Sequence, residues 1–380
     1  MARGNHTSAV LDPAERLARL RLIRTENVGP VTFQHLLIRY GSARAALEKL
    51  PDLARRGGRR AKLSIPTPDR IEQEIAANEQ AGARLLVIGE PDYPALLAQI
   101  EGAPAALSLR GHPHLFLEPS VAVVGARNAS GNAIRFTEKL ARDLGEHGVI
   151  VVSGLARGID TAAHRGALES GTVAVVAGGV DIVYPPENAE LQGRIAAEGA
   201  LLAEAPIGTR PLARHFPARN RIIAGLARAT MVVEAAKRSG SLITARFAAD
   251  QGREVCAVPG SPMDPRCAGS NGLLRDGAHL IERAEDILVL LLRGGVREDP
   301  PLSDLFGSTE FAPQTTEEID DKARDRVMTI LDATPLAVDE IIRRCQLSPP
   351  VVLTILLEAE LAGEAERHPG NRVARRYNPP

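Results

Sequence analysis

Hydrophobic residues gather in short, Val-rich runs along the middle of the chain, from about residue 84 to residue 292. The first runs are Leu85–Ile88 and Leu107–Leu109. Six later runs are apolar throughout, as strands buried on both faces of a parallel sheet must be: Val121–Val124, Val149–Val152, Val173–Val176, Leu201–Leu202, Met231–Val233 and Val255–Val258. Helical stretches separate these runs, at 131–147, 159–170, 187–198, 217–227 and 241–251. This alternation predicts βαβ crossovers, and so an α/β fold with a doubly wound, mostly parallel, Rossmann-like sheet.

The residues before this region have a helical periodicity instead. Residues 1–83 predict a small helical domain, in which Pro13–Thr25 and Val31–Tyr40 flank the tight turn Asn27-Val28-Gly29-Pro30. A helix, a Val-Gly-Pro turn and a second helix resemble a SAM or helix-hairpin-helix domain, whose turn amides can touch a phosphate. A plain helical bundle that packs against the main domain explains the pattern equally well.

The chain changes character again after residue 293. A Pro- and acid-rich stretch over 294–320 predicts a linker. Asp321–Leu331, Ala337–Cys345 and Ser348–Leu361 predict three helices, and Gly363–Tyr377 predicts a basic hairpin. Three helices and a hairpin resemble a winged-helix domain. The expected domains are therefore a helical domain (1–83), a Rossmann-like domain (84–293), a linker (294–320) and a winged-helix-like domain (321–380).

With 44% hydrophobic and 24% charged side chains, the composition agrees with a soluble, globular protein. A chain of 380 residues is longer than a usual domain with a single hydrophobic core, so we expect two or three domains. No signal-like N-terminus and no run of about 18 apolar residues is present, so we expect a cytoplasmic protein without a membrane partner. Cys256, Cys267 and Cys345 have neither CxxC spacing nor a paired His cluster, which favours reduced thiols over a metal site. Cys256 falls within an apolar run, as a core residue does.

A formal net charge of −1 conceals an uneven distribution of charge. Between Ala205 and Arg253, nine basic residues face only Glu234 and Asp250, which gives that window a net charge of +7. The nine are Arg210, Arg214, Arg219, Arg221, Arg228, Lys237, Arg238, Arg246 and Arg253. Such a cluster favours a polyanionic ligand, although solvated faces of ordinary helices are the alternative.

The strand ends carry glycine, serine and arginine, and a doubly wound sheet binds its ligands at these ends. After the first core strand, Arg127 stands where a dinucleotide site would place its second glycine, so a guanidinium can clamp a phosphate there instead. After the second, the small residues of Ser153–Gly158 would let a phosphodiester reach the helix amides, and Asp160 is placed to cap that helix.

A third such junction follows Glu234, where Ser239-Gly240-Ser241 opens a helix beneath Lys237 and Arg238. Three amide-rich helix starts and several cations at one sheet edge predict a long anion groove. The chain has no Trp and only eleven Phe and Tyr residues, so binding should follow the backbone and tolerate any sequence, with single strands favoured if the groove is too narrow for a duplex. The expected DNA contacts are Gly125, Arg127, Ser130, Ser153, Gly154, Arg157, Gly158, Arg219, Asn220, Arg221, Lys237, Ser239, Gly240, Ser241 and Thr244.

Taken together, these motifs are similar to those of the DNA-processing protein A (DprA/Smf) family. The resemblance rests on Val123–Arg127 with Ser130, Ser153–His164, Tyr184–Asn188, Phe216–Ile223, Glu234-Ala235 with Ser239–Ala245, and Val258-Pro259-Gly260, which occur in order over about 85–290. It implies an extended Rossmann-like domain, a groove for single-stranded DNA, a homodimer, no cofactor, and delivery of DNA to RecA during natural transformation. It also implies that Arg127 is the leading DNA contact and that Ser153, Gly154, Arg157, Arg219, Ser239 and Gly240 belong to the groove.

The chain departs from the family at Pro186, where members often carry a basic residue. That contact is either lost or supplied by a neighbour such as Arg210 or Arg214.

An enzyme is the competing class. Rossmann-like phosphoribohydrolases of the lysine-decarboxylase type share glycine-rich strand ends and a catalytic Glu, whereas here Glu234 precedes the comparable loop and no Glu follows within it. His164 lies one turn after Asp160, but no nucleophile shares its motif, which favours a packed histidine over a catalytic one. We therefore expect a DNA-binding protein rather than an enzyme.

Overall fold

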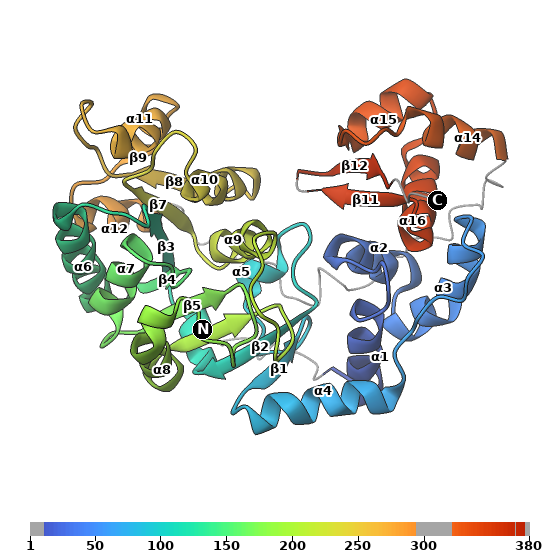
Figure 1. Cartoon of the computed structure of the whole chain (residues 1–380), viewed down its shortest axis with the longest axis horizontal. Helices are drawn as coiled ribbons and strands as arrows, with labels where there is room; N and C mark the ends of the chain where they lie inside the picture. The colour runs from blue at the N-terminus through green and yellow to red at the C-terminus, as the bar shows by residue number, and fades with distance from the viewer. Residues whose placement is uncertain (1–10, 294–320, 369, 377–380) are drawn as a thin grey trace, which may run out of the picture. The chain divides into compact units, whose positions relative to one another are not determined.

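A computed structural model describes residues 11–293, 321–368 and 370–376. These residues form two compact units (Figure 1). The first unit contains the described residues from Glu72 to Arg293. The second combines Leu11–Ile71 with the described residues from Asp321 onward, so it is built from both ends of the chain. The predicted linker, 294–320, lies outside the described residues.

A nine-stranded sheet organises the first unit. Its strands are β1 (Arg84–Val87), β2 (Ala106–Gly111), β3 (Ser120–Gly125), β4 (Ile150–Ser153), β5 (Thr172–Val176), β6 (Ala200–Ala203), β7 (Ala229–Val233), β8 (Glu254–Ala257) and β9 (His279–Leu280). They lie in the order β1-β2-β6-β5-β4-β3-β7-β8-β9. The pairs β1–β2 and β2–β6 are antiparallel, and all other pairs are parallel. The expected doubly wound, mostly parallel sheet is confirmed.

Helices cover both faces of this sheet (Figure 1). The helical segments are α4 (Pro68–Gln80), which runs across the unit boundary, α5 (Ala95–Ala98), η1 (Pro113–Leu117), α6 (Gly131–Glu146), α7 (Ile159–Ala167), η2 (Pro186–Asn188), α8 (Ala189–Glu198), α9 (His215–Gly225), α10 (Gly240–Asp250), η3 (Pro265–Cys267), α11 (Ala268–Arg275) and α12 (Ala284–Arg293). The helices α6, α7 and α12 pack over β3, β4 and β7 around one apolar cluster. The helices α9 and α10 pack on each other on the other side of the sheet. The reversal in strand order at β3 and β7 places successive crossovers on opposite faces.

The second unit joins two small helical domains. Its N-terminal part consists of α1 (Pro13–Ile23), α2 (Pro30–Tyr40) and α3 (Ala43–Arg56). Its C-terminal part is a winged helix, with α14 (Asp321–Ile330), β10 (Leu336–Ala337), α15 (Val338–Cys345), α16 (Pro349–Ala362), β11 (Ala365–His368) and β12 (Arg372–Arg375). The strands form a small sheet in the order β10-β12-β11. The expected helical and winged-helix domains are therefore confirmed, except that Tyr377, at the end of the predicted hairpin, lies outside the described residues.

No single helix among the described residues is long and apolar enough to cross a membrane. The helices α15 and α16 reach that length and apolar content only as a pair, which is bent by 117°.

Candidate nucleic-acid interface

A groove opens where the strand order changes direction. From β3 the chain runs through β4, β5 and β6 on one side, while β7, β8 and β9 lie on the other. Such a switch point leaves a crevice beyond the carboxyl ends of the strands. The groove has a volume of about 470 Å³, and its walls come from the end of β3 and the first turns of α9 and α10. Eight of the fifteen residues expected from the sequence line it: Gly125, Arg127, Arg219, Asn220, Ser239, Gly240, Ser241 and Thr244.

The strand β3 ends in a glycine, and an exposed arginine follows two residues later. A Cβ atom on Gly125 would lie 2.0 Å from the Val233 carbonyl oxygen, so β3 and β7 can run this close only with glycine there. Arg127 is exposed, and its guanidinium carbon lies 5.3 Å from the centroid of the Phe216 ring. No ion pair between described residues involves Arg127, so its charge remains available to an anion. Contact with an aromatic face leaves that charge in place.

The start of α6 is already occupied by a carboxylate of the chain. Glu234 accepts hydrogen bonds from the Ser130 backbone N–H (2.8 Å) and from the Ser130 hydroxyl (2.6 Å). The Ser130 hydroxyl oxygen also accepts from the Ala133 N–H (3.1 Å) and so caps the helix. Ser130, expected as a DNA contact, is thus bound within the protein, because Glu234 fills the place that a phosphate would take at this helix terminus.

The loop between β4 and α7 satisfies its own amides in a similar way. The Asp160 carboxylate accepts from the N–H groups of Gly154 (3.2 Å) and Ala156 (3.3 Å). Asp160 therefore holds the loop before the helix, and the expectation that it caps α7 is corrected: Gly158 is the residue at the cap, with φ of 77°. A Cβ on Gly158 would lie 2.2 Å from the Ala126 carbonyl oxygen, so this glycine serves backbone contact. Ser153 is buried, and its hydroxyl donates to the Val123 carbonyl (2.6 Å).

Arg219 lies at the bottom of the groove and is not one of its exposed side chains. Its side chain is buried, and Nη1 donates to the carbonyls of Gly154 (2.5 Å) and Val175. Burial lowers the pKa of Arg219 to about 10, against the opposing effect of Asp160. Burial likewise raises the pKa of Asp160 to about 6, although Arg219 and the two loop amides oppose this shift. Arg219 and Asp160 thus form the floor of the site.

The start of α10 is the most open of the three helix starts. Ser239 caps the helix through its hydroxyl, which accepts from the Ser241 N–H (3.3 Å). Gly240 is exposed, and a Cβ on it would meet nothing within 4 Å. Asn220 from α9 donates to the Gly240 carbonyl (3.4 Å), while Arg238 is exposed and lines the groove. Ser241 and Thr244 line the groove but are themselves buried.

The remaining expected cations differ in their availability. Arg221 donates to both oxygens of Glu204 (3.0 and 2.7 Å) and is mostly buried, so it is neutralised within the fold. Lys237 is exposed next to Arg238 but does not line the groove. Arg157 is 64% exposed and lies 3.9 Å from a Glu187 carboxylate oxygen, a distance too long for a strong ion pair.

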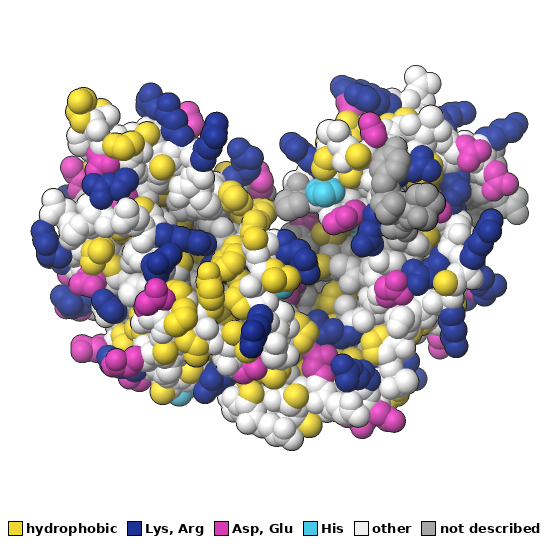
Figure 2. Space-filling model, viewed as in Figure 1, with side chains coloured by type: hydrophobic (Ala, Val, Ile, Leu, Met, Phe, Trp, Pro, Cys, Tyr) yellow, Lys and Arg dark blue, Asp and Glu magenta, His cyan; other side chains and the backbone are white. Residues whose placement is uncertain are grey.

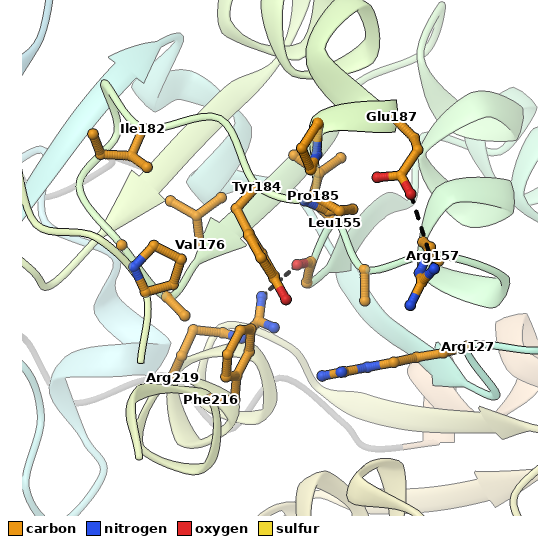
Figure 3. A pocket seen from close by; sticks show the side chains of 16 residues that line it. Arg127, Leu155, Arg157, Val176, Ile182, Tyr184, Pro185, Glu187, Phe216 and Arg219 are labelled. Atoms are coloured by element: carbon orange, nitrogen blue, oxygen red, sulfur yellow. Dashed lines mark hydrogen bonds and ion pairs between the residues drawn. The ribbon is translucent and has the colours of Figure 1, made fainter. Parts of the chain in front are cut away.

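A smaller pocket of about 180 Å³ adjoins the groove and shares Arg127, Phe216 and Arg219 with it (Figure 3). Tyr184 and Phe216 bring their ring centroids to 5.7 Å in this pocket, and Arg157 also lines it. Figure 3 shows Arg127 extending toward Phe216, with Arg219 behind the two rings. Aromatic residues are scarce in the chain, and this pair was not expected from the sequence. Their signal was their place within the quoted motifs Tyr184–Asn188 and Phe216–Ile223.

Basic side chains do not form one continuous field on the visible face of the protein. Figure 2 shows Lys and Arg interspersed with Asp and Glu on both units. The +7 window overstates the free charge near the groove, because Arg219 is buried, Arg221 is paired with Glu204, and Arg253 donates to the Leu96 carbonyl (3.0 Å).

His164 and Cys256 are core residues, as expected. His164 is fully buried, and its Nδ1 lies 2.8 Å from the Thr172 hydroxyl. Burial, with a smaller effect of Arg219, lowers the pKa of His164 to about 3. The three cysteines are free and buried, and burial raises the pKa of Cys256 to about 12.

One group of side chains has the spacing of metal ligands. Ligand atoms of Glu234, Asp264 and Cys267 lie within 4.8 Å of one another. Both carboxylates already have partners, since Glu234 accepts from Ser130 and Asp264 accepts from the Arg266 guanidinium at 2.7 Å. The donor set therefore does not support a resident metal.

The sequence profile of the family described as DNA recombination-mediator protein A matches residues 84–292, which is more than half of the chain. A DprA-like N-terminal HHH domain matches residues 13–77, and a DprA winged helix domain matches residues 311–371. The chain is 36% identical to Protein Smf of Escherichia coli over 320 residues, which cover 82% of each protein.

Two solved structures are similar in both sequence and fold. DNA processing protein A (DprA) from Streptococcus pneumoniae is 36% identical, with a TM-score of 0.58 over 72% of this chain and 96% of that one. DNA processing protein A from Helicobacter pylori, whose structure was described for its single-stranded DNA binding mode, is 29% identical, with a TM-score of 0.50 over 53% of this chain and 93% of that one.

Proposed function

Since the chain belongs to the DprA family of DNA recombination-mediator proteins, we propose that it binds single-stranded DNA along the groove at the β3–β7 switch point. The observation that carries the proposal is the set of exposed polar groups on this groove, namely Arg127, Arg238 and the open start of α10 at Gly240. Cations and free amides arranged along a groove fit a phosphate backbone. The single-stranded DNA bound by the Helicobacter pylori relative supports the same ligand here.

The expected site residues fall into two roles. We assign direct contacts with the DNA backbone to Arg127, Arg157, Asn220, Lys237, Ser239 and Gly240, with Arg238 added. We assign positioning roles to Gly125, Ser130, Ser153, Gly154, Gly158, Arg219, Arg221, Ser241 and Thr244, whose side chains are buried or paired, or whose glycine backbone packs closely. The positioning residues hold the strand ends so that the exposed groups face one ligand.

The side pocket gives a reason for single strands to be favoured. Tyr184 and Phe216 offer aromatic faces beside Arg127, and stacking on such faces requires an unpaired base. Stacking depends little on the identity of the base, so the binding should tolerate any sequence.

Arg210 and Arg214 are suitable replacements for a basic residue at Pro186. Both are exposed, and the segment that carries them contributes Pro211 to the pocket that Pro186 also lines. We propose that they contact the strand as it leaves the pocket.

The decisive experiment compares Arg127→Ala with Arg135→Ala by fluorescence anisotropy on labelled single strands and duplexes. Arg135 is an exposed arginine on α6 that donates to Asn132, outside the groove, and so serves as a matched control. Loss of a charge-assisted contact at Arg127 should weaken single-strand binding roughly ten- to hundredfold. The control should bind as the unchanged protein does. Equal affinities of both variants, with unchanged circular dichroism, would remove the groove as the DNA site.

The finer functional steps are proposals that rest on the resemblance to the family. We propose that the protein acts in the cytoplasm as a homodimer, protects incoming DNA during natural transformation and loads RecA onto single strands. RecA strand exchange on strands precoated with a single-strand-binding protein tests the loading step. Nuclease protection without acceleration of strand exchange would leave a DNA-protecting protein that is no loader.

A nucleotide phosphoribohydrolase is the alternative that the fold leaves open. The carboxylate nearest to the comparable loop, Glu234, has both oxygens bonded to Ser130 and is buried, which does not suit a general acid or base. Release of free base from nucleoside monophosphates would support the enzyme instead.

A further inference from the structure

The third helix of the winged-helix domain, α16, has an unusual composition for its place in the fold. It follows α15 as the second helix of a helix-turn-helix, the position that usually enters the DNA major groove. Its sequence from Pro349 to Ala362 contains no Lys or Arg. The exposed positions near its start are Pro349, Pro350 and Leu353, whose side chains have no hydrogen-bonding group that could read a base edge.

The other faces of α16 are buried. One face contributes Val352, Ile355 and Leu356 to the core of the winged helix. Glu358 and Glu360 are also buried, although isolated buried carboxylates are costly. Within the winged helix, Arg324 of α14 lies 3.4 Å from a Glu358 carboxylate oxygen, and Arg367 of β11 lies 2.9 Å from a Glu360 carboxylate oxygen.

The N-terminal helices supply further partners for both carboxylates. The Thr32 hydroxyl on α2 donates to a Glu360 carboxylate oxygen (2.8 Å). The Arg56 guanidinium at the end of α3 lies 3.2 Å from a Glu358 carboxylate oxygen. Figure 1 shows α16 beside these two helices within the second unit.

Backbone contacts make this interface close-fitting. A Cβ on Gly57, directly after α3, would lie 2.1 Å from the Glu358 carbonyl oxygen. The Gly57 backbone is in the ordinary right-handed region, with φ of −61°, so only the contact with α16 requires glycine there.

The turn between α1 and α2, Asn27–Pro30, lies against the same helix. The Asn27 side chain donates to the Leu361 carbonyl at the end of α16 (3.3 Å). The Val28 N–H donates to the Thr25 carbonyl within the turn (3.1 Å). The turn thus contacts α16 through the Asn27 side chain.

We propose that α16 is a protein-docking helix whose occupant is the N-terminal helical domain of the same chain, and that α16 is not a DNA-binding surface. The two motifs join the ends of the chain into one module. The proposal is independent of the groove, whose residues all belong to the first unit.

Occlusion of a DNA-reading helix is the competing explanation, and the side chains argue against it. A helix that reads DNA after release would carry cations or amides on its covered face. The covered face of α16 presents Glu358 and Glu360, which are paired with Arg324 and Arg367 of the same domain, and the helix has no cation of its own to offer a phosphate.

The test compares Gly57→Ala with Gly29→Ala in the full chain. A Cβ on Gly29, also in the second unit, meets nothing within 4 Å, so this variant is the matched control. We expect Gly57→Ala to raise hydrogen exchange in α16 at least tenfold and the control, whose residue is the N-cap of α2, to leave exchange in α16 unchanged. By anisotropy, single-strand affinity should stay within about twofold in both variants, and duplex affinity should not rise.

A milder variant covers the case in which Gly57→Ala does not fold. Thr32→Val keeps the shape of the side chain but removes the hydrogen bond to Glu360, a bond to a charged group whose loss should raise exchange in α16 roughly tenfold or more. Unchanged exchange in this variant and in any folded Gly57→Ala would overturn the docking role. A tenfold gain in duplex affinity when exchange rises would instead identify α16 as an occluded DNA reader.

Discussion

Asp160 and Arg219 hold the same residue from opposite sides: the Asp160 carboxylate accepts from the Gly154 N–H, and the Arg219 guanidinium donates to the Gly154 carbonyl. The loop after β4 is therefore fixed before any ligand arrives. Because the Asp160 carboxylate occupies the loop amides, a bound phosphate must rely on Arg127 and the start of α10. This division between positioning and contacting groups leads to distinct expectations for each residue.

The first prediction concerns Asp160→Asn and pH. Burial raises the pKa of Asp160 to about 6 in the folded protein, above its value of about 3.9 in an unfolded chain. Between these values the folded state binds more protons, so the contribution of Asp160 to the free energy of unfolding decreases as pH rises from about 4 to 6. Asn does not titrate, so the stability of wild type relative to the variant should fall by about 3 kcal/mol over that window. Urea unfolding of both proteins at several pH values measures the difference, and a constant difference would contradict the raised pKa.

The second prediction separates Arg219 from Arg127. Arg219→Ala leaves the buried Asp160 carboxylate without its cation and should cost about 3–5 kcal/mol of folding stability. The double variant with Asp160→Asn should be less destabilised than the sum of the two single variants, since the residues are coupled. Denaturant unfolding tests this. If Arg219→Ala kept full stability and lost only DNA binding, Arg219 would be a contact residue after all.

The third prediction uses two glycines of the groove. Gly125→Ala would place a Cβ 2.0 Å from the Val233 carbonyl oxygen and should destabilise the fold by about 1–3 kcal/mol or more. Gly240→Ala has open space and should change stability by less than about 0.5 kcal/mol. The methyl group of that variant would stand where a phosphate approaches the start of α10, so its single-strand affinity should fall. Thermal unfolding and anisotropy on both variants provide the comparison, and full affinity in Gly240→Ala would place the strand elsewhere.

The fourth prediction concerns salt. Each single-strand phosphate neutralised contributes a slope of about −0.7 to the dependence of log K on log salt. A groove with about four phosphate contacts should therefore give a slope near −3. Titrations between low and physiological salt measure this slope. An affinity independent of salt would indicate a small uncharged ligand instead of a nucleic-acid backbone.

The fifth prediction is for a chain that ends at Gly295. All groove residues remain, so single-strand affinity should stay within about twofold of the full protein. The N-terminal helices lose α16, which bonds Thr32 and contacts Gly57, so their amides should exchange much faster. Loss of DNA binding by a folded truncated chain would show that the winged helix, rather than the groove, is the DNA site.

The hydrophobic pattern of the sequence predicted most strands of the sheet, because these strands are buried on both faces. The apolar run Val173–Val176 became β5, Thr172–Val176, and the other core runs matched to within a few residues. The strand β9 was missed, since it has only two residues, His279 and Leu280, and both are exposed. A strand that buries no side chain leaves no hydrophobic period to detect.

The site was only partly predictable, because the sequence does not show which groups satisfy one another. Ser130 and Glu234 are 104 positions apart, yet their hydrogen bonds fill one of the three expected anion sites. Gly125 and Arg127 lie at the end of β3, and Gly240 opens α10, at the strand ends where the pattern predicted them. Their separation into free and internally bonded groups depends on contacts that only the folded chain brings together.

The second unit is built from Leu11–Ile71 and the residues from Asp321 onward, which the ribosome synthesises at different times. The helix α3 ends at Arg56, and its partner α16 begins at Pro349, about 300 residues later. At about 5–20 residues per second, the N-terminal helices wait roughly 15–60 s for the helix that covers them. During this delay the nascent protein carries an uncovered surface around Gly57 and Thr32, which α16 covers only after it has been translated.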